Sequence, residues 1–146
     1  MIDFPQEDAD FLFAMEKYRA DENTYRFPDL GGCVRIPLKS KDLREDFILD
    51  IHRMSVQLKK NTFQNRARTN VILARIDIGG PLHRNPDGEE IPCPHIHLYK
   101  EGFDDKWAYP LPEVFSNPAD CWKTLEEFMK FCNITQIPHI EKGLFV

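Results

Sequence analysis

Apolar side chains recur at helical spacing near each end of the chain. Between Gln6 and Asp21 they return every three or four residues, and acidic residues occupy the first turn, where the helix dipole favours negative charge. A second stripe follows Pro118, a residue that suits the first position of a helix. The apolar members of that stripe are Trp122, Leu125, Phe128, Met129 and Cys132. The pattern predicts helices at Gln6–Asp21 and Pro118–Cys132.

Between these two stretches the spacing of apolar residues changes. Short segments rich in β-branched and aromatic residues are separated by turn sequences such as NPDG and EGFDD. They are residues 33–38, 47–54, 70–78, 95–99 and 106–111, with a sixth strand expected within 56–63. The connections are too short for helical crossovers, so a mostly antiparallel sheet is expected. The predicted fold is α+β, with a five- to six-stranded sheet flanked by an N-terminal and a C-terminal helix.

The composition is that of an ordinary folded domain. The 146 residues, 42% hydrophobic and 29% charged, fit a single domain at 1–146. The net charge of -5 argues against specific nucleic-acid binding, although bases and no acids lie between residues 51 and 76. No apolar run approaches the ~20 residues of a membrane span, and the N-terminus lacks a signal-peptide pattern. We therefore expect a cytoplasmic protein with reduced cysteines and no membrane partner.

Several potential metal ligands gather around the NPDG turn. They are His83, Cys93, His95 and His97. Because strand side chains alternate between faces, His95 and His97 project together, about 6.7 Å apart at the backbone, so one metal ion can bridge them. Prolines on both sides of Cys93 favour a bend that returns its thiol to the site, and a hairpin brings His83 opposite.

One cysteine and three histidines form a ligand set that suits tetrahedral zinc. Four protein ligands fill the coordination shell, and no HExxH motif is present, so one structural zinc ion per chain is expected. Asp87 or Glu89 in the turn is an alternative ligand. Arg75 and Asp77 alternate outward from their strand, beside the site or simply on the surface. The other interpretation is a polar strand face without metal, in which Cys93 is a small buried residue.

Two functions are compatible with this pattern. In the first, the protein has no catalytic residues and acts by binding another protein, while the zinc ion fixes a loop. In the second, it is a metal-dependent endoribonuclease toxin of a toxin–antitoxin system. His95 or His97 then supplies the acid and base, and the basic run from Arg53 to Arg75 holds phosphates. The acidic total charge counts against the second function.

The stretch from Arg75 to Pro112 carries a resemblance. Its HxNPDG and CPHxHxY elements are similar to those of an uncharacterised family of small proteins from bacteria and prophages. In size, acidity and expected zinc site the chain also resembles zinc-containing anti-CRISPR inhibitors of the type II-A nuclease Cas9. That resemblance implies a phage or prophage protein that binds Cas9 in the host cytoplasm and blocks loading or cleavage of target DNA. The acidic N-terminal helix would suit the basic channels of such a partner.

Overall fold

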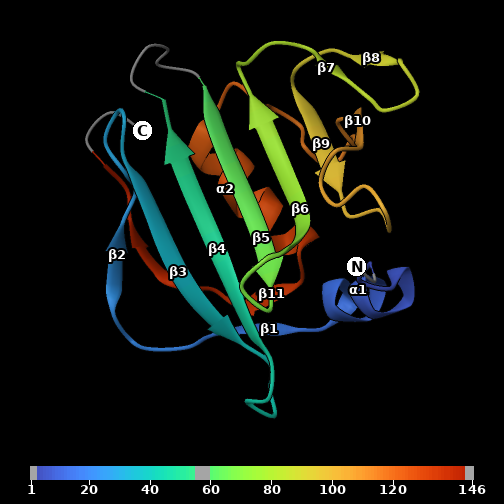
Figure 1. The fold of residues 1–146 in the computed structure, drawn as a ribbon. Coiled ribbons are helices and arrows are strands. Elements are labelled where there is room, and N and C mark those ends of the chain that lie inside the picture. Colours follow the sequence, from blue (N-terminus) through green and yellow to red (C-terminus); the bar gives the residue numbers. More distant parts are fainter. Residues whose placement is uncertain (1–2, 55–59, 144–146) are drawn as a thin grey trace.

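The main element of the fold is a twisted sheet. The structure is a computed structural model that describes residues 3–54 and 60–143. Eight strands follow the order β10-β9-β6-β5-β4-β3-β1-β11 (Figure 1). Consecutive antiparallel pairs join the long central strands, as the short connections require. These strands are β3 (Cys33–Lys39), β4 (Asp46–Arg53), β5 (Asn61–Ala67) and β6 (Val71–Ile78).

Shorter strands extend the sheet on both sides. On one side β9 (His95–Leu98) pairs with β6 and with β10 (Ala108–Pro110). On the other side β1 (Lys17–Arg19) pairs with β3 and, in parallel, with β11 (Ile134–Gln136). Two separate ribbons are formed by β2 (Thr24–Arg26) with β12 (His139–Glu141) and by β7 (His83–Arg84) with β8 (Glu90–Ile91).

One face of the sheet is covered by α2 (Cys121–Phe131), which lies behind it in Figure 1. The helix begins after Asp120, whose side chain accepts a hydrogen bond from the backbone N–H of Lys123 at 3.1 Å. This cap explains why the helix starts later than the predicted Pro118. Phe128 is fully buried and its ring lies 6.3 Å from that of Phe63 on β5. The hydrophobic core therefore sits between α2 and the sheet.

The first helix is shorter than predicted. Apolar spacing indicated a helix over Gln6–Asp21, but α1 spans Gln6–Ala14 and Met15 is extended, with φ -65° and ψ 136°. Residues of β1 are instead hydrogen-bonded between β3 and β11. Pairing within the sheet overrides the local preference for helix, because sheet hydrogen bonds and burial outweigh the small propensity differences along the stretch.

The α+β class, the mostly antiparallel sheet and the two flanking helices are confirmed. The sheet has eight strands rather than five to six, since β1 and β11 have three residues each and are too short to show an alternating pattern. The expected strand within 56–63 overlaps the start of β5, and its residues 56–59 lie outside the described residues. Neither helix in the described part of the chain is long and apolar enough to cross a membrane.

The sheet face opposite α2 is polar, and we call it the open face. No described helix lies over it in Figure 1. The antiparallel register aligns its side chains in two rows that cross β4, β5, β6 and β9. One row is Asp50, Gln64, Arg75 and His97, and the other is His52, Thr62, Asp77 and His95. Strand alternation thus places potential ligands from four strands on one surface.

Lys17 connects both helices to the sheet from a fully buried position. Its Nζ donates hydrogen bonds to the carbonyl oxygens of Phe13 at 2.9 Å, Met15 at 3.0 Å and Cys132 at 2.7 Å. The ammonium group also lies 5.0 Å from the centre of the Phe47 ring. Burial lowers the pKa of Lys17 to about 8. The side chain therefore donates hydrogen bonds to carbonyl oxygens near the ends of α1 and α2, where helix geometry leaves carbonyls without a partner in the helix.

Replacing Lys17 by Met should lower the free energy of unfolding by about 3 kcal/mol, because one buried and two partly buried carbonyl groups lose their donor. Urea denaturation followed by circular dichroism measures this change. Lys41→Met, at an exposed position, is the matched control and should leave the unfolding midpoint close to wild type. Equal stability of the two variants would contradict the role given to Lys17.

Candidate metal centre

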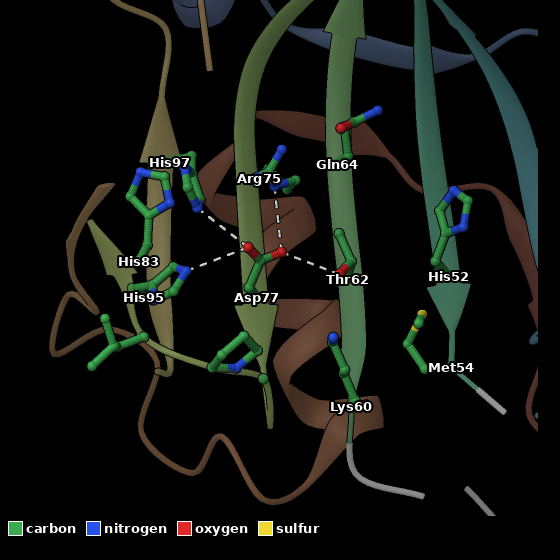
Figure 2. Close-up of a pocket in the computed structure, with 13 residues that line it drawn as sticks. His52, Met54, Lys60, Thr62, Gln64, Arg75, Asp77, His83, His95 and His97 are labelled. Atoms are coloured by element: carbon green, nitrogen blue, oxygen red, sulfur yellow. Dashed lines mark hydrogen bonds and ion pairs between the residues drawn. The ribbon is translucent and has the colours of Figure 1, made fainter. Parts of the chain in front are cut away.

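Three side chains from two adjacent strands converge on the open face. Asp77 comes from β6, and His95 and His97 come from β9, where Asp77 pairs with His95 in register. Oδ2 of Asp77 lies 3.3 Å from Nε2 of His95 and 3.2 Å from Nε2 of His97 (Figure 2). One ligand atom from each residue lies within 4.8 Å of the other two. The arrangement is two imidazoles and one carboxylate aimed at a common point.

Each of the two histidines is oriented by a hydrogen bond from its other ring nitrogen. Nδ1 of His95 lies 3.2 Å from the carbonyl oxygen of Pro92, and Nδ1 of His97 lies 2.8 Å from that of Asp105. A carbonyl oxygen only accepts, so each Nδ1 carries the proton. In the neutral rings the Nε2 lone pair is then free. Metal-binding histidines are held in this way, with the second nitrogen donating to a backbone carbonyl or carboxylate.

The two oxygens of Asp77 have different partners. Oδ1 accepts a hydrogen bond from the hydroxyl of Thr62 at 3.1 Å and lies 3.4 Å from Nε of Arg75. Oδ2 faces the two histidines. Burial by itself raises the pKa of Asp77, but His97, Arg75 and Thr62 outweigh it and lower the pKa to about 2. The residue is therefore a carboxylate at neutral pH and offers one oxygen to the common point.

The electrostatics of this point favour a cation. Nε2 of His97 is buried and makes no hydrogen bond, although it lies 3.2 Å from Oδ2 of Asp77. Burial lowers the pKa of His95, and the neighbouring His97 lowers it further, against an opposing effect of Asp77. Atoms bound to a tetrahedral ion at about 2.0–2.1 Å lie about 3.3–3.4 Å from each other. The separations of Oδ2 from the two Nε2 atoms, 3.3 Å and 3.2 Å, are close to that spacing, whereas charged N–H···O hydrogen bonds are nearer 2.7–2.9 Å.

His83 lies beside the cluster but is not one of its three members. Its ring centre is 4.7 Å from that of His97 and 6.0 Å from that of His95. Nε2 of His83 lies 2.7 Å from the carbonyl oxygen of Lys106, so this nitrogen is the donor and Nδ1 is unprotonated in the neutral ring. The ring therefore forms a wall of the site, and it is absent from the group whose ligand atoms lie within 4.8 Å.

Cys93 is placed apart from the ligand cluster. Its Sγ donates to the carbonyl oxygen of Asp77 at 3.2 Å and accepts from the backbone N–H of Gly80 at 3.2 Å. The thiol therefore joins the end of β6 to the following loop. Asp87 and Glu89 are exposed in the turn, where Asp87 accepts a hydrogen bond from the N–H of Glu89 at 3.0 Å. None of these three residues belongs to the group of convergent ligand atoms.

Asp77 is the residue of the cluster that sequence analysis did not place among the ligands. Strand alternation put it on the outward face, but a surface position explained that equally well. The missing information was the pairing of β6 with β9, which sets Asp77 opposite His95. The sequence did contain part of the evidence for Asp77 as a ligand, because both strands flank the same turn and their outward residues carry ligand atoms.

A pocket of about 450 Å³ opens in front of the cluster, lined by residues from β4, β5, β6 and β9 and by the loop after β6. His95 and His97 are almost fully buried, whereas the Asp77 side chain is 23% exposed. Figure 2 shows His52 and Met54 on β4 and the segment that follows it, across β5 from Asp77. The ligand atoms thus lie at one wall of an accessible pocket and are not enclosed on every side.

Comparison with known proteins identifies a family for the chain. The model of a family of unknown function, DUF6978, matches residues 4–134, so the chain belongs to that family. This agrees with the expected membership of an uncharacterised family, and its description assigns no activity. No curated protein and no solved structure matches the chain.

The position of His83 depends on Asn85 in the β7–β8 ribbon. Asn85 is buried, its Nδ2 donates to the carbonyl oxygen of Ala108 at 2.9 Å, and its Oδ1 accepts from the N–H of Ala108 at 2.8 Å. This pair of hydrogen bonds fastens the ribbon to β10.

Asn85→Ala should lower the free energy of unfolding by about 2 kcal/mol, because both backbone groups of Ala108 lose a buried partner. It should also speed amide hydrogen exchange in residues 83–91. Exchange measured by mass spectrometry tests this, with Glu89→Gln in the exposed part of the turn as control. The same exchange rates in both variants would show that Asn85 does not hold the ribbon.

Proposed function

We propose that this protein binds one divalent transition metal ion through Oδ2 of Asp77 and Nε2 of His95 and His97 and presents it to a ligand in the pocket, as a metal-dependent enzyme does. The observation that carries this proposal is the convergence of the three atoms, two of them on rings whose other nitrogen donates to a backbone carbonyl. Without a cation or an added proton, three lone pairs would face one another at short distance.

The donor set suits zinc or iron(II). Imidazole nitrogen with carboxylate oxygen is found in catalytic zinc sites and in the two-histidine, one-carboxylate sites of non-haem iron proteins. A structural zinc ion held by Cys93 and three histidines was expected from the sequence, but Cys93 Sγ contacts backbone groups and His83 Nε2 contacts Lys106. Three protein ligands leave room for an exogenous ligand, which favours a catalytic over a structural ion.

The proposed metal site is compatible with the ribonuclease hypothesis. Part of the basic surface that was expected to hold phosphates, however, is already paired with carboxylates. Arg66 forms ion pairs with both oxygens of Asp50, at 2.7 Å and 3.1 Å. Arg75 is paired with Asp105 and Asp77. Holding successive phosphates would require these arginines to leave carboxylates that already neutralise them. The open face therefore suits a small ligand better than an RNA strand.

A second candidate function is inhibition of Cas9 by direct binding, which follows from the resemblance of the chain, in size, acidity and expected zinc site, to zinc-containing anti-CRISPR inhibitors. The observation that favours it is the surface of α1. Glu7, Asp8 and Asp10 are exposed there, and Phe11, which follows them on the same helix, is 68% exposed. An exposed aromatic ring among acidic groups would suit a basic protein surface. In this function the metal ion stabilises the fold around β9 and takes no part in a reaction.

Metal analysis of purified protein tests the first proposal. Wild type should bind about one zinc ion per chain, and Asp77→Asn, His95→Ala and His97→Ala should each weaken zinc affinity at least 100-fold, since even loss of a group that only orients a ligand costs 10–100-fold. Cys93→Ser is the matched control and should retain the ion. Loss of zinc from Cys93→Ser with retention in Asp77→Asn would support the cysteine-containing site instead.

Activity assays separate the candidate functions. If the protein inhibits Cas9, an equimolar amount should suppress DNA cleavage, and Phe11→Ser should relieve the inhibition while Asp77→Asn protein that remains folded should not. The inhibitor proposal fails if a large molar excess leaves cleavage unchanged. If the protein is a ribonuclease, catalytic amounts should degrade RNA with turnover, and this activity should vanish in Asp77→Asn.

A further inference from the structure

The pocket in front of the metal centre has a charge and a shape that point to one class of ligand. We propose that it binds a small organic phosphate ester, with the phosphate between the metal ion and Lys60 and the organic group against Met54 and Leu82. This inference rests on the proposed metal site. It adds the identity of the ligand class and two recognition elements that the metal ligands do not include.

The charges that line the pocket attract anions. Among the described residues, the charged side chains that line it, apart from the histidines, are Lys60, Arg75 and Asp77. The carboxylate of Asp77 is directed at the two histidines and at Thr62. With a divalent ion bound at Asp77, and with Asp105 counted as the partner of Arg75, positive charge exceeds negative charge by about two units. A partly enclosed site of this kind concentrates anions strongly.

Lys60 is the cation best placed to meet a ligand of the metal ion. It precedes Thr62 by two positions, so both side chains lie on the open face, and Figure 2 shows them on the same side of the sheet as Asp77. Within the described residues Lys60 forms no ion pair, whereas Arg75 is already bound to Asp105. A free ammonium group is a strong donor to a phosphate oxygen.

Gly80 makes room for this lysine. A methyl group built on the Gly80 backbone would lie 3.2 Å from Cε of Lys60 and 3.8 Å from its Nζ. The Lys60 side chain therefore lies against the loop that follows β6, and that loop also carries Pro81 and Leu82 on the pocket wall. The absence of a side chain at Gly80 lets the ammonium group sit at the pocket surface near β6.

The pocket is also lined by exposed apolar side chains, which we call the apolar rim. Met54 and Leu82 both line the pocket and are 43% and 53% exposed, although large hydrophobic side chains are usually buried. An organic group on the ligand would cover apolar surface that the chain leaves exposed. The volume of about 450 Å³ falls within the range of sites for small molecules of nucleotide size, roughly 300–1,000 Å³.

A phosphate ester fits this combination better than a carboxylate does. A phosphate monoester carries nearly two negative charges and three peripheral oxygens at neutral pH, so separate oxygens can reach the metal ion and Lys60 at once. A carboxylate carries one charge and has two oxygens close together. The anion site does not extend farther along the open face, since Arg66 is already ion-paired with Asp50 there.

The test uses cobalt-loaded protein, because Co²⁺ replaces zinc in such sites and its visible spectrum responds to a new ligand. Phenyl phosphate, inorganic phosphate and benzoate are titrated into the full chain. We expect phenyl phosphate to change the spectrum with saturation, to bind about fivefold more tightly than inorganic phosphate because of the apolar rim, and to bind far more tightly than benzoate.

Variants assign the recognition elements. Lys60→Gln should bind Co²⁺ normally but weaken phenyl phosphate about tenfold, whereas Lys123→Gln on α2 serves as matched control and should change neither affinity. Leu82→Ser should weaken phenyl phosphate while leaving inorganic phosphate unaffected. These selective losses would support the proposal, because a general structural defect would change all ligands and the Co²⁺ spectrum together.

The contrary outcomes are distinguishable. Bound Co²⁺ with a spectrum indifferent to phenyl phosphate would overturn the ligand class and leave the metal site standing. Benzoate binding as tightly as phenyl phosphate would also overturn it, as would equal affinities of Lys60→Gln and wild type for phenyl phosphate. Failure of folded protein to bind Co²⁺ or Zn²⁺ at all would remove the metal site on which this inference rests.

Discussion

Backbone hydrogen bonds between β6 and β9 set Asp77 opposite His95 and Arg75 opposite His97. Because side chains alternate across a strand, a slip of one residue in either strand would turn these groups toward the core and bring Ile76 and Ile96 to the open face. Ile76 and Ile96 are fully buried, so the hydrophobic core resists such a slip. The same burial that stabilises the sheet therefore fixes the position of the proposed ligands.

The polar cluster is tolerable in a buried setting because most of its atoms are already satisfied. Each Nδ1 of the two histidines has a backbone carbonyl, and Oδ1 of Asp77 has Thr62 and Arg75. What remains is a set of three lone pairs aimed at one point. Holding these lone pairs close together lowers the stability of the fold when no cation is bound. Binding of a cation restores that stability, since a ligand that binds only the folded state stabilises the folded state. The metal proposal thus links the fold and the chemistry of the pocket.

Much of this arrangement could be predicted from the sequence, within limits that have physical causes. Alternation along the strand was enough to expect His95 and His97 on one face. Asp77 was left at the surface because its neighbour depends on a pairing between strands that sequence alone does not specify. The two prolines beside Cys93 indicated a bend, and we expected it to turn the thiol toward the site. Prolines do not specify the direction of a bend, and Sγ contacts backbone groups of Asp77 and Gly80. The end of α1 was missed because β1 gains its partners only in the folded sheet.

The most direct test is zinc X-ray absorption spectroscopy of the loaded wild-type protein, because it reports the atoms bound to the ion. The proposed site predicts a shell of nitrogen and oxygen at about 2.0–2.2 Å, with the scattering pattern of two imidazole rings and no sulfur. A sulfur atom at about 2.3 Å would place Cys93 in the site and contradict the ligand set of Asp77, His95 and His97.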